Sequence, residues 1–251
     1  MEAAAGGSAA ESPSLRSTAP RFVFALALLL AATPAAAELA RTRAPAPHDL
    51  EMAAARFEAA GVPPEPLRLA LRAFECGRAR GDFATPILTL VDFRRPSTER
   101  RLWVLDLGAG TVRFHELVAH GSQSGELHAQ RFSNAVGSRQ SSLGLFRTGD
   151  TYRGRHGYSL RLEGLEPGTN DRAFERAIVM HAAHYATEDF AIRVGRLGRS
   201  WGCPALDPAV HRDLIDAVRG GTALFAYFPE PGWLGTSAYL DCGVGDESIA
   251  P

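Results

Sequence analysis

A histidine and a cysteine in this chain have the chemistry of a base and a nucleophile. His181 follows the apolar run 177–180, and Cys203 lies 22 residues further on, in the segment Gly198-Arg-Ser-Trp-Gly-Cys-Pro204. A thiol is a strong nucleophile at neutral pH when a neighbouring base removes its proton. The apolar run predicts a short buried strand, so His181 would emerge where that strand leaves the core.

The residues around Cys203 could support such chemistry. Gly202 permits a backbone conformation that a side chain would block, and the amides of Gly202 and Cys203 could form an oxyanion hole. Asp207, Pro208 and the pattern that follows predict a helix over 208–219, whose positive end would favour the thiolate. A Cys/His pair is weak evidence by itself, because a single cysteine is more often structural.

The composition is that of a globular protein without a charge bias toward nucleic acid. The chain has 251 residues, of which 45% are hydrophobic and 22% charged, and its net charge is −1. These values are ordinary for a globular protein, and the balanced charge gives no long-range attraction to nucleic acid. We expect no nucleic-acid partner and no cofactor.

The N-terminal residues resemble an export signal. Arg16 and Arg21 precede an apolar run over 22–32, and the segment 35–37 is an Ala-Ala-Ala cleavage site. The run has the length of a signal-peptide core and is short for a membrane span. We predict cleavage after Ala37 and export to the periplasm or cell envelope. The alternative is an uncleaved anchor, the one case in which we expect membrane association.

Export affects the interpretation of the three cysteines. Disulfides form in oxidising compartments, and an odd number of cysteines leaves one unpaired. A bridge between Cys76 and Cys242 would join the two ends of the mature chain and leave Cys203 free. Connectivity cannot be deduced from the sequence, so this pairing is a hypothesis.

The hydrophobic pattern divides the chain into regions. We predict a signal peptide at 1–37, a linker and two helices at 38–80, a catalytic domain at 81–230 and an irregular tail at 231–251. Residues 49–61 and 64–80 have helical spacing, after which the period changes toward two. Predicted strands lie at 87–93, 101–107, 111–119, 145–146, 158–162, 177–180 and 222–228. The fold class is therefore mainly β.

A polar, glycine-rich segment covers residues 120–144. Long polar segments inside compact domains are often functional, and the Ser, Asn, Gln and His side chains here suit a peptide or sugar-linked ligand. Ser133 and Asn134 are candidate substrate-binding residues. The alternative is a solvated loop.

The residue pattern over 80–230 resembles the murein L,D-transpeptidase catalytic domain family, of the YkuD type. The motif is a histidine followed some twenty residues later by Ser/Thr-x-Gly-Cys, here His181 and Ser200-Trp-Gly-Cys203. The segments that carry the resemblance are LTLVDF (88–93), STERRLWVLDL (97–107), VAHG (118–121), FSN (132–134), SSLGLFRTGDTY (141–152), HGYSLRLEGLE (156–166), ERAIVMH (175–181) and GRLGRSWGCPAL (195–206).

The resemblance implies a β-sandwich or barrel domain, with one helix after the cysteine and a small N-terminal helical segment. It implies chemistry on the tetrapeptide stems of peptidoglycan, with Cys203 as nucleophile, His181 as base and Ser200 and Gly202 in the catalytic segment. Cys203 would attack the carbonyl of an L-residue joined to a D-residue. The thioester would pass to another stem, to a lipoprotein lysine or to water, which would make the enzyme an L,D-carboxypeptidase.

The chain departs from the family pattern at three positions. Trp201 replaces a frequent second histidine, so that position cannot act as a base and could instead contact the ligand. Ala182 stands where many members have a glycine. Pro204-Ala205 follows Cys203 where an arginine or asparagine is frequent, which leaves carboxylate recognition to another side chain, with Arg199 and Arg139 as candidates. His184 is a competing base or a ligand contact, and we favour His181 because it matches the motif.

Two other interpretations remain open. His181, His184, Cys203 and His211 could be zinc ligands, although the usual zinc spacings are missing from the sequence. The chain could also be a non-catalytic envelope binding module that uses the 120–144 segment and has a structural Cys203.

Overall fold

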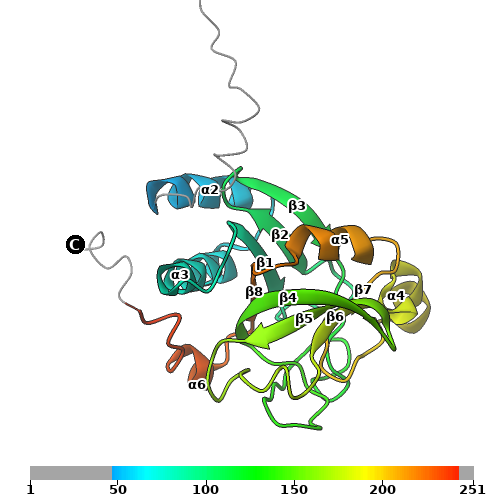
Figure 1. Ribbon diagram of the computed structural model, residues 1–251. Coiled ribbons are helices and arrows are strands. Elements are labelled where there is room, and N and C mark those ends of the chain that lie inside the picture. Colours follow the sequence, from blue (N-terminus) through cyan, green and yellow to red (C-terminus); the bar gives the residue numbers. More distant parts are fainter. Residues whose placement is uncertain (1–46, 243–251) are drawn as a thin grey trace, which may run out of the picture. The chain divides into compact units, whose positions relative to one another are not determined.

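A computed structural model describes residues 47–242 of the protein (Figure 1). Within this range the chain forms a curved sheet of eight strands with helices around it. The predicted signal peptide, its cleavage site and the linker up to residue 46 lie outside the described residues. No helix among residues 47–242 is long and apolar enough to cross a membrane.

The strands follow one another in the order β3-β2-β1-β8-β4-β5-β6-β7 across the sheet. Their bounds are β1 Ile87–Asp92, β2 Leu102–Asp106, β3 Thr111–Glu116, β4 Gly144–Gly154, β5 Gly157–Gly164, β6 Val179–Ala182, β7 Ala205–Leu206 and β8 Ala223–Tyr227. Beyond β3, the Ala119 N–H donates to the Ala205 carbonyl of β7 over 2.9 Å. This contact between the two ends of the strand order makes the sheet a nearly closed barrel.

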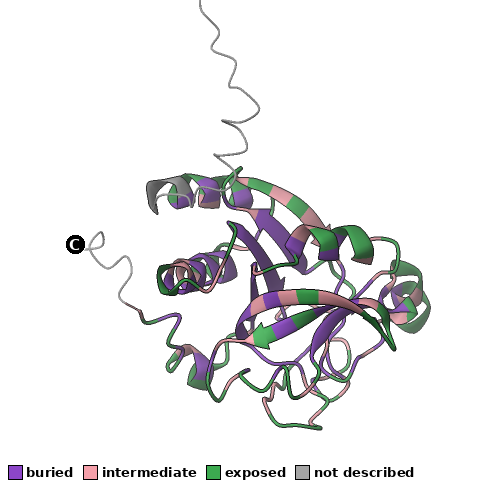
Figure 2. Ribbon diagram, in the orientation of Figure 1, coloured by how far each residue is buried: buried purple, intermediate pink, exposed green. Residues whose placement is uncertain are grey.

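The central strands are buried on both faces, as Figure 2 shows. Every residue of β1 and β8 is buried, whereas β3 at the edge of the strand order is half-exposed. Strand β1 is buried because two helices contact it, α3 (Pro64–Arg80) and α5 (His211–Val218). Strand β3 is contacted by α2 (Pro47–Ala59) (Figure 1). The mainly β fold class predicted from the sequence is confirmed.

The strand predicted at 145–146 is longer in the structure, where it is β4 Gly144–Gly154, and two predicted elements nearer Cys203 begin later than predicted. Strand β6 begins at Val179 rather than at Ala177, because Ala177 has a φ of +53°, which a strand does not allow. Helix α5 begins at His211 with Val210 as its N-cap, because the Asp207 carboxylate instead accepts the Ala209 N–H in a preceding turn. Asp207 is therefore not the N-cap.

Two short helices have no counterpart among the predicted elements. Helix α4 (Glu188–Val194) begins where the Thr187 hydroxyl accepts the Phe190 N–H, and it ends at Gly195 in a left-handed conformation. Helix α6 (Pro231–Leu234) lies in the segment expected to be irregular. Its Trp233 is buried and donates its indole N–H to Glu166 over 2.9 Å, so the C-terminal segment packs on the barrel.

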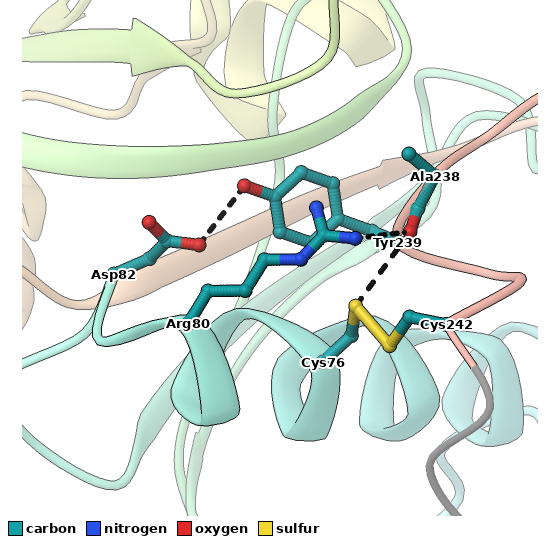
Figure 3. The surroundings of a disulfide bond; sticks show 6 residues. All are labelled: Cys76, Arg80, Asp82, Ala238, Tyr239 and Cys242. Carbon is teal, nitrogen blue, oxygen red and sulfur yellow. Dashed lines mark hydrogen bonds between the residues drawn. A yellow bond between two sulfur atoms is a disulfide. The ribbon is translucent and has the colours of Figure 1, made fainter.

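The C-terminal segment is also tied to α3 by a disulfide between Cys76 and Cys242, as hypothesised (Figure 3). The surrounding contacts run between the same two segments. Arg80 donates to the Ala238 carbonyl over 2.9 Å and lies over the Tyr239 ring, whose hydroxyl donates to Asp82. The bridge leaves Cys203 as the free cysteine.

We predict that breaking this bridge destabilises the domain. The bridge spans 166 residues of sequence, and a cross-link of this kind restricts the unfolded chain. In a Cys203→Ala background, which prevents mispairing, Cys242→Ala should lower the free energy of unfolding by about 2–4 kcal/mol. Denaturant titration under oxidising conditions measures the loss. Equal stabilities of the single and double variants would contradict the prediction.

Candidate active site

His181 and Cys203 lie on neighbouring segments of the sheet. Strands β6 and β7 are parallel and pair His181 with Ala205, so Cys203, two residues before Ala205, runs beside Val179. The Val179 N–H points at the Cys203 sulfur over 3.5 Å, and the thiol lies 3.7 Å from the Ala177 carbonyl. The short parallel pair therefore brings together two residues that are 22 positions apart.

The His181 ring is held in one tautomer. Its Nδ1 lies 2.9 Å from the Ala182 carbonyl oxygen, which can only accept, so Nδ1 carries the proton and Nε2 is an acceptor. The side chain is buried, and the ring of His156 stacks on it with centroids 4.4 Å apart. Burial lowers the pKa of His181, the hydrogen bond to the Ala182 carbonyl acts in the opposite direction with a smaller effect, and His156 and His211 also lower the pKa. His181 is therefore a neutral imidazole with one free nitrogen at neutral pH.

The thiol is also neutral in this arrangement. Burial raises the pKa of Cys203, while the Val179 amide and the Arg176 guanidinium act in the opposite direction with smaller effects. The expectation that the surroundings favour the thiolate is wrong, because burial has the largest effect on the thiol and raises its pKa. The hydrogen bonds of the described residues pair the thiol with Ala177 and Val179 rather than with His181.

Ser200 holds the turn that carries the cysteine. Its hydroxyl accepts the Gly202 N–H over 3.0 Å and donates to the Cys203 carbonyl over 2.6 Å. Its backbone N–H donates to the His120 carbonyl, which fixes the turn to the segment after β3. The Gly202 amide, which we expected to be one of two oxyanion donors, is instead bonded to the Ser200 hydroxyl within the turn. The Cys203 amide has no hydrogen-bond partner among residues 47–242.

The position of Gly202 requires a residue without a side chain. Its φ is +122°, and a Cβ at this position would lie 2.6 Å from the Gln140 carbonyl oxygen and 3.1 Å from an Arg176 nitrogen. The Gly202 carbonyl in turn accepts the Ser141 hydroxyl over 3.3 Å. The turn therefore packs directly against Gln140 and Ser141 of the polar loop that precedes β4.

Arg176 is a site residue that the sequence analysis did not assign. Its guanidinium donates to the carbonyls of Ser133 and Gln140 and to the hydroxyls of Ser138 and Ser142, at 2.5–3.3 Å. It thereby fixes the 133–142 loop beside Gly202 and places a positive charge near the thiol. The residue lies in the quoted segment ERAIVMH, but nothing in the spacing indicates that its side chain turns toward the cysteine.

His156 is the second residue that the sequence analysis did not assign. It is exposed at the tip of the β4–β5 hairpin and covers the ring of His181. The antiparallel pairing of Ser159 with His181 brings the hairpin tip to that ring. This contact depends on the register between β5 and β6, which the sequence does not reveal.

The candidate ligand-binding residues differ in what they contact. Ser133 and Asn134 are engaged internally, with the Asn134 amide donating to Asp171 over 2.7 Å. Arg199 is bonded to the carbonyls of Ser122 and Gly125 and to Glu126. His184 is exposed at the start of the 3₁₀ turn His184–Ala186. Trp201 is 66% exposed, with the Arg139 guanidinium 4.7 Å from its ring centroid.

Two backbone conformations mark the same region. Arg139 and Ala177 are the two non-glycine residues with positive φ in the range 47–242, at +54° and +53°. Such conformations cost of order 1–3 kcal/mol each and persist where the surrounding structure enforces them. One lies beside Trp201 and the other provides a carbonyl to the Cys203 thiol.

Among the described residues, no group of three or more His, Cys, Asp or Glu side chains could hold a metal ion.

Comparison with known families decides the identity of this domain. A family model described as "L,D-transpeptidase catalytic domain" matches residues 58–227, well over half of the chain. The chain belongs to the L,D-transpeptidase catalytic domain family. The match begins within α2 and ends with β8, so it includes all eight strands and the Cys203 turn.

The solved structures that resemble this L,D-transpeptidase domain are distant from it. An L,D-transpeptidase from Mycobacterium smegmatis is 16% identical, with 57% of this chain and 59% of that chain covered and a TM-score of 0.35. An L,D-transpeptidase from Xylanimonas cellulosilytica is 16% identical over 61% and 68%, with a TM-score of 0.32. A helical cell shape determining protein from Campylobacter jejuni is 13% identical over 56% and 46%, with a TM-score of 0.35. A search of curated proteins found no match.

We predict that Gly202→Ala distorts the Cys203 turn of this domain. The added Cβ would collide with the Gln140 carbonyl and displace Arg176, and the positive φ would be strained. We expect a loss of about 1–3 kcal/mol in the free energy of unfolding and a disordered Cys203 turn. Thiol reactivity and denaturant titration measure both effects. Gly157→Ala, which is also at positive φ but has open space around its Cβ, is the control for backbone strain. Unaltered Cys203 reactivity in Gly202→Ala would contradict the prediction.

We predict that His156→Ala raises the pKa of His181. Without the stacked ring, water reaches the imidazole, the desolvation of its charged form falls, and one source of repulsion is lost. The pKa should move up toward the ordinary value of about 6.5. NMR titration of the His181 ring measures it, with His184→Ala as the exposed-histidine control. A lower or unchanged pKa in His156→Ala would show that the stack does not shield His181.

Proposed function

We propose that the protein is an exported, cysteine-dependent peptidoglycan L,D-transpeptidase that acts on stem tetrapeptides through a thioester on Cys203. The observation that carries this proposal is the position of a free thiol beside the strand of His181, whose unprotonated Nε2 can accept a proton. Membership of the L,D-transpeptidase family supports the class of reaction. The disulfide between Cys76 and Cys242 supports export, because such bonds persist in oxidising compartments.

The first half-reaction forms the thioester. Both groups start neutral, so the Cys203 proton moves to His181 Nε2 as the sulfur attacks the carbonyl carbon of the L-residue. The thiol first rotates away from the Ala177 carbonyl, since catalytic contacts are often looser before substrate binds. The tetrahedral oxyanion accepts the Cys203 N–H. When the C–N bond breaks, His181 returns the proton to the amine of the departing D-amino acid.

The second half-reaction releases the enzyme. An amine of another stem attacks the thioester carbonyl, the new amide forms, and the C–S bond breaks. His181 takes a proton from the attacking amine and passes it to the Cys203 sulfur. If water attacks instead, the product is a shortened stem with a free carboxylate, which is carboxypeptidase activity.

Three residues have positioning roles in this proposal. Ser200 keeps the Cys203 backbone in place through its bonds to both ends of the turn, and Gly202 allows the turn to lie against Gln140. The positive charge of Arg176 offsets part of the burial that disfavours the thiolate. With these contacts the attacking atom and its oxyanion donor belong to one rigid loop.

Mass spectrometry tests the mechanism directly. Residues 38–251, incubated with a defined stem tetrapeptide, should gain the mass of the peptide minus its terminal D-amino acid. Cys203→Ala should give no adduct while remaining folded. His181→Ala should slow acylation by about 10²- to 10⁴-fold, because the general base is removed.

The controls identify the base and the product. His184→Ala leaves the His181 imidazole in place, so acylation should stay close to that of the unmodified protein. A larger loss in His184→Ala than in His181→Ala would reassign the base. An adduct on Cys203→Ala, or peptide turnover by it, would refute the thioester. The released products separate cross-linking, D-amino-acid exchange and hydrolysis.

A further inference from the structure

Three arginines surround the Cys203 turn, and they differ in how their guanidinium groups are used. Arg176 has four hydrogen-bond acceptors around it, and Arg199 has two carbonyls and the carboxylate of Glu126. The Arg139 guanidinium has no hydrogen bond or ion pair with any of residues 47–242 and lies over the indole of Trp201. Of the three, Arg139 is the one whose N–H donors can receive a ligand.

The backbone of Arg139 is fixed although its side chain is exposed. Its carbonyl accepts the Gln123 N–H over 3.0 Å and packs so closely on Gly121 that a Cβ there would lie 2.5 Å from it. The next residue, Gln140, is held by Arg176 and lies against Gly202. These contacts enforce the positive φ of Arg139 and aim its side chain at Trp201. Strained residues that the surroundings hold in this way cluster at ligand sites.

Trp201 has the opposite character, a large apolar side chain that the fold leaves 66% exposed next to the catalytic turn. Its Cα lies within about 7.6 Å of that of Cys203, because the two residues are separated by one position. An indole face is a good platform for a guanidinium, and stacking restricts the arginine to few rotamers while its N–H edge stays available. The pair is therefore a pre-organised cationic edge on the turn that carries the thiol.

We propose that Arg139 and Trp201 form a carboxylate-binding subsite that receives the terminal carboxylate of the departing D-residue. This inference rests on the proposed function, in which the residue after the scissile carbonyl is the last of the stem. Its carboxylate is then separated from the scissile nitrogen by a single carbon, which places it near Cys203. A guanidinium edge matches a carboxylate in a bidentate geometry. The subsite selects donors that end one residue after the scissile bond, and it disfavours longer stems.

Acylation by two matched peptides tests the subsite. The donors are a stem tetrapeptide with a free C-terminal carboxylate and the same peptide as its C-terminal amide. The unmodified protein should favour the acid by roughly three- to tenfold in kcat/KM, mainly through KM, because the pair is partly solvated. Arg139→Gln should remove this preference and Arg139→Lys should restore part of it. Trp201→Leu, which releases the guanidinium, should reduce the preference.

The control variant is Arg68→Gln, which removes an exposed arginine from α3, and it should keep the full preference. Arg139 and Trp201 are exposed, so their variants should fold, and thermal unfolding confirms that they do. Equal rates for acid and amide in the unmodified protein, or the same preference in Arg139→Gln, would overturn the subsite.

Alkylation of Cys203 gives a readout that does not require transpeptidation. Iodoacetate carries a carboxylate and iodoacetamide does not, and each transfers its carbon to the sulfur with loss of iodide. The rate of alkylation by iodoacetate divided by the rate with iodoacetamide should fall about threefold in Arg139→Gln and stay constant in Arg68→Gln. If no peptide acylates the protein and the ratio still falls, the proposed function fails and the carboxylate site stands. If the peptides acylate equally and the ratio is unchanged, the function stands and the subsite fails.

Discussion

The two-residue parallel pairing between β6 and β7 is the contact on which the site depends. It sets His181 opposite Ala205 and therefore runs Cys203 beside Val179. A single-residue slip would turn His181 to the other face of the sheet, because side chains alternate along a strand. So short a strand pair cannot hold this register alone. The Ala119–Ala205 contact closes the barrel against β7, and the Ser200 backbone bonds to the His120–Ser122 segment, so the register is fixed from both sides.

The electrostatics of the site follow from the same burial. Removing His181 and Cys203 from water lowers the pKa of the imidazole and raises that of the thiol, so both are neutral at rest. A thiolate–imidazolium pair formed before substrate binds would present a stronger nucleophile, but burying its two charges would cost more free energy. Arg176 partly compensates near the sulfur, and its own charge is satisfied by the acceptors of the 133–142 loop. In the proposed reaction, burial therefore means that the proton moves from Cys203 to His181 during the attack.

Much of the architecture could be predicted from the sequence, and the failures have identifiable causes. Strong periodicity gave the strands near 87–93 and 101–107 and the helix after Pro63, because burial on a regular face leaves a repeating pattern. Helix α4 was missed although Thr187, Glu188 and Gly195 are start and stop signals, since it has only seven residues. Asp207 has the residue type of an N-cap but belongs to a turn, because a local signal does not distinguish the two.

The sequence by itself indicated which residues could carry the proposed chemistry. One cysteine in a Ser-Trp-Gly-Cys segment and a histidine at the end of an apolar run are properties of residue type and local spacing. Tertiary structure alone decided that Gly202 donates to Ser200, that Arg176 and His156 belong to the site, and that Arg139 rather than Arg199 keeps its donors available. These facts depend on contacts between segments tens of residues apart, and such contacts are set by strand register and barrel closure, which leave no local trace in the chain.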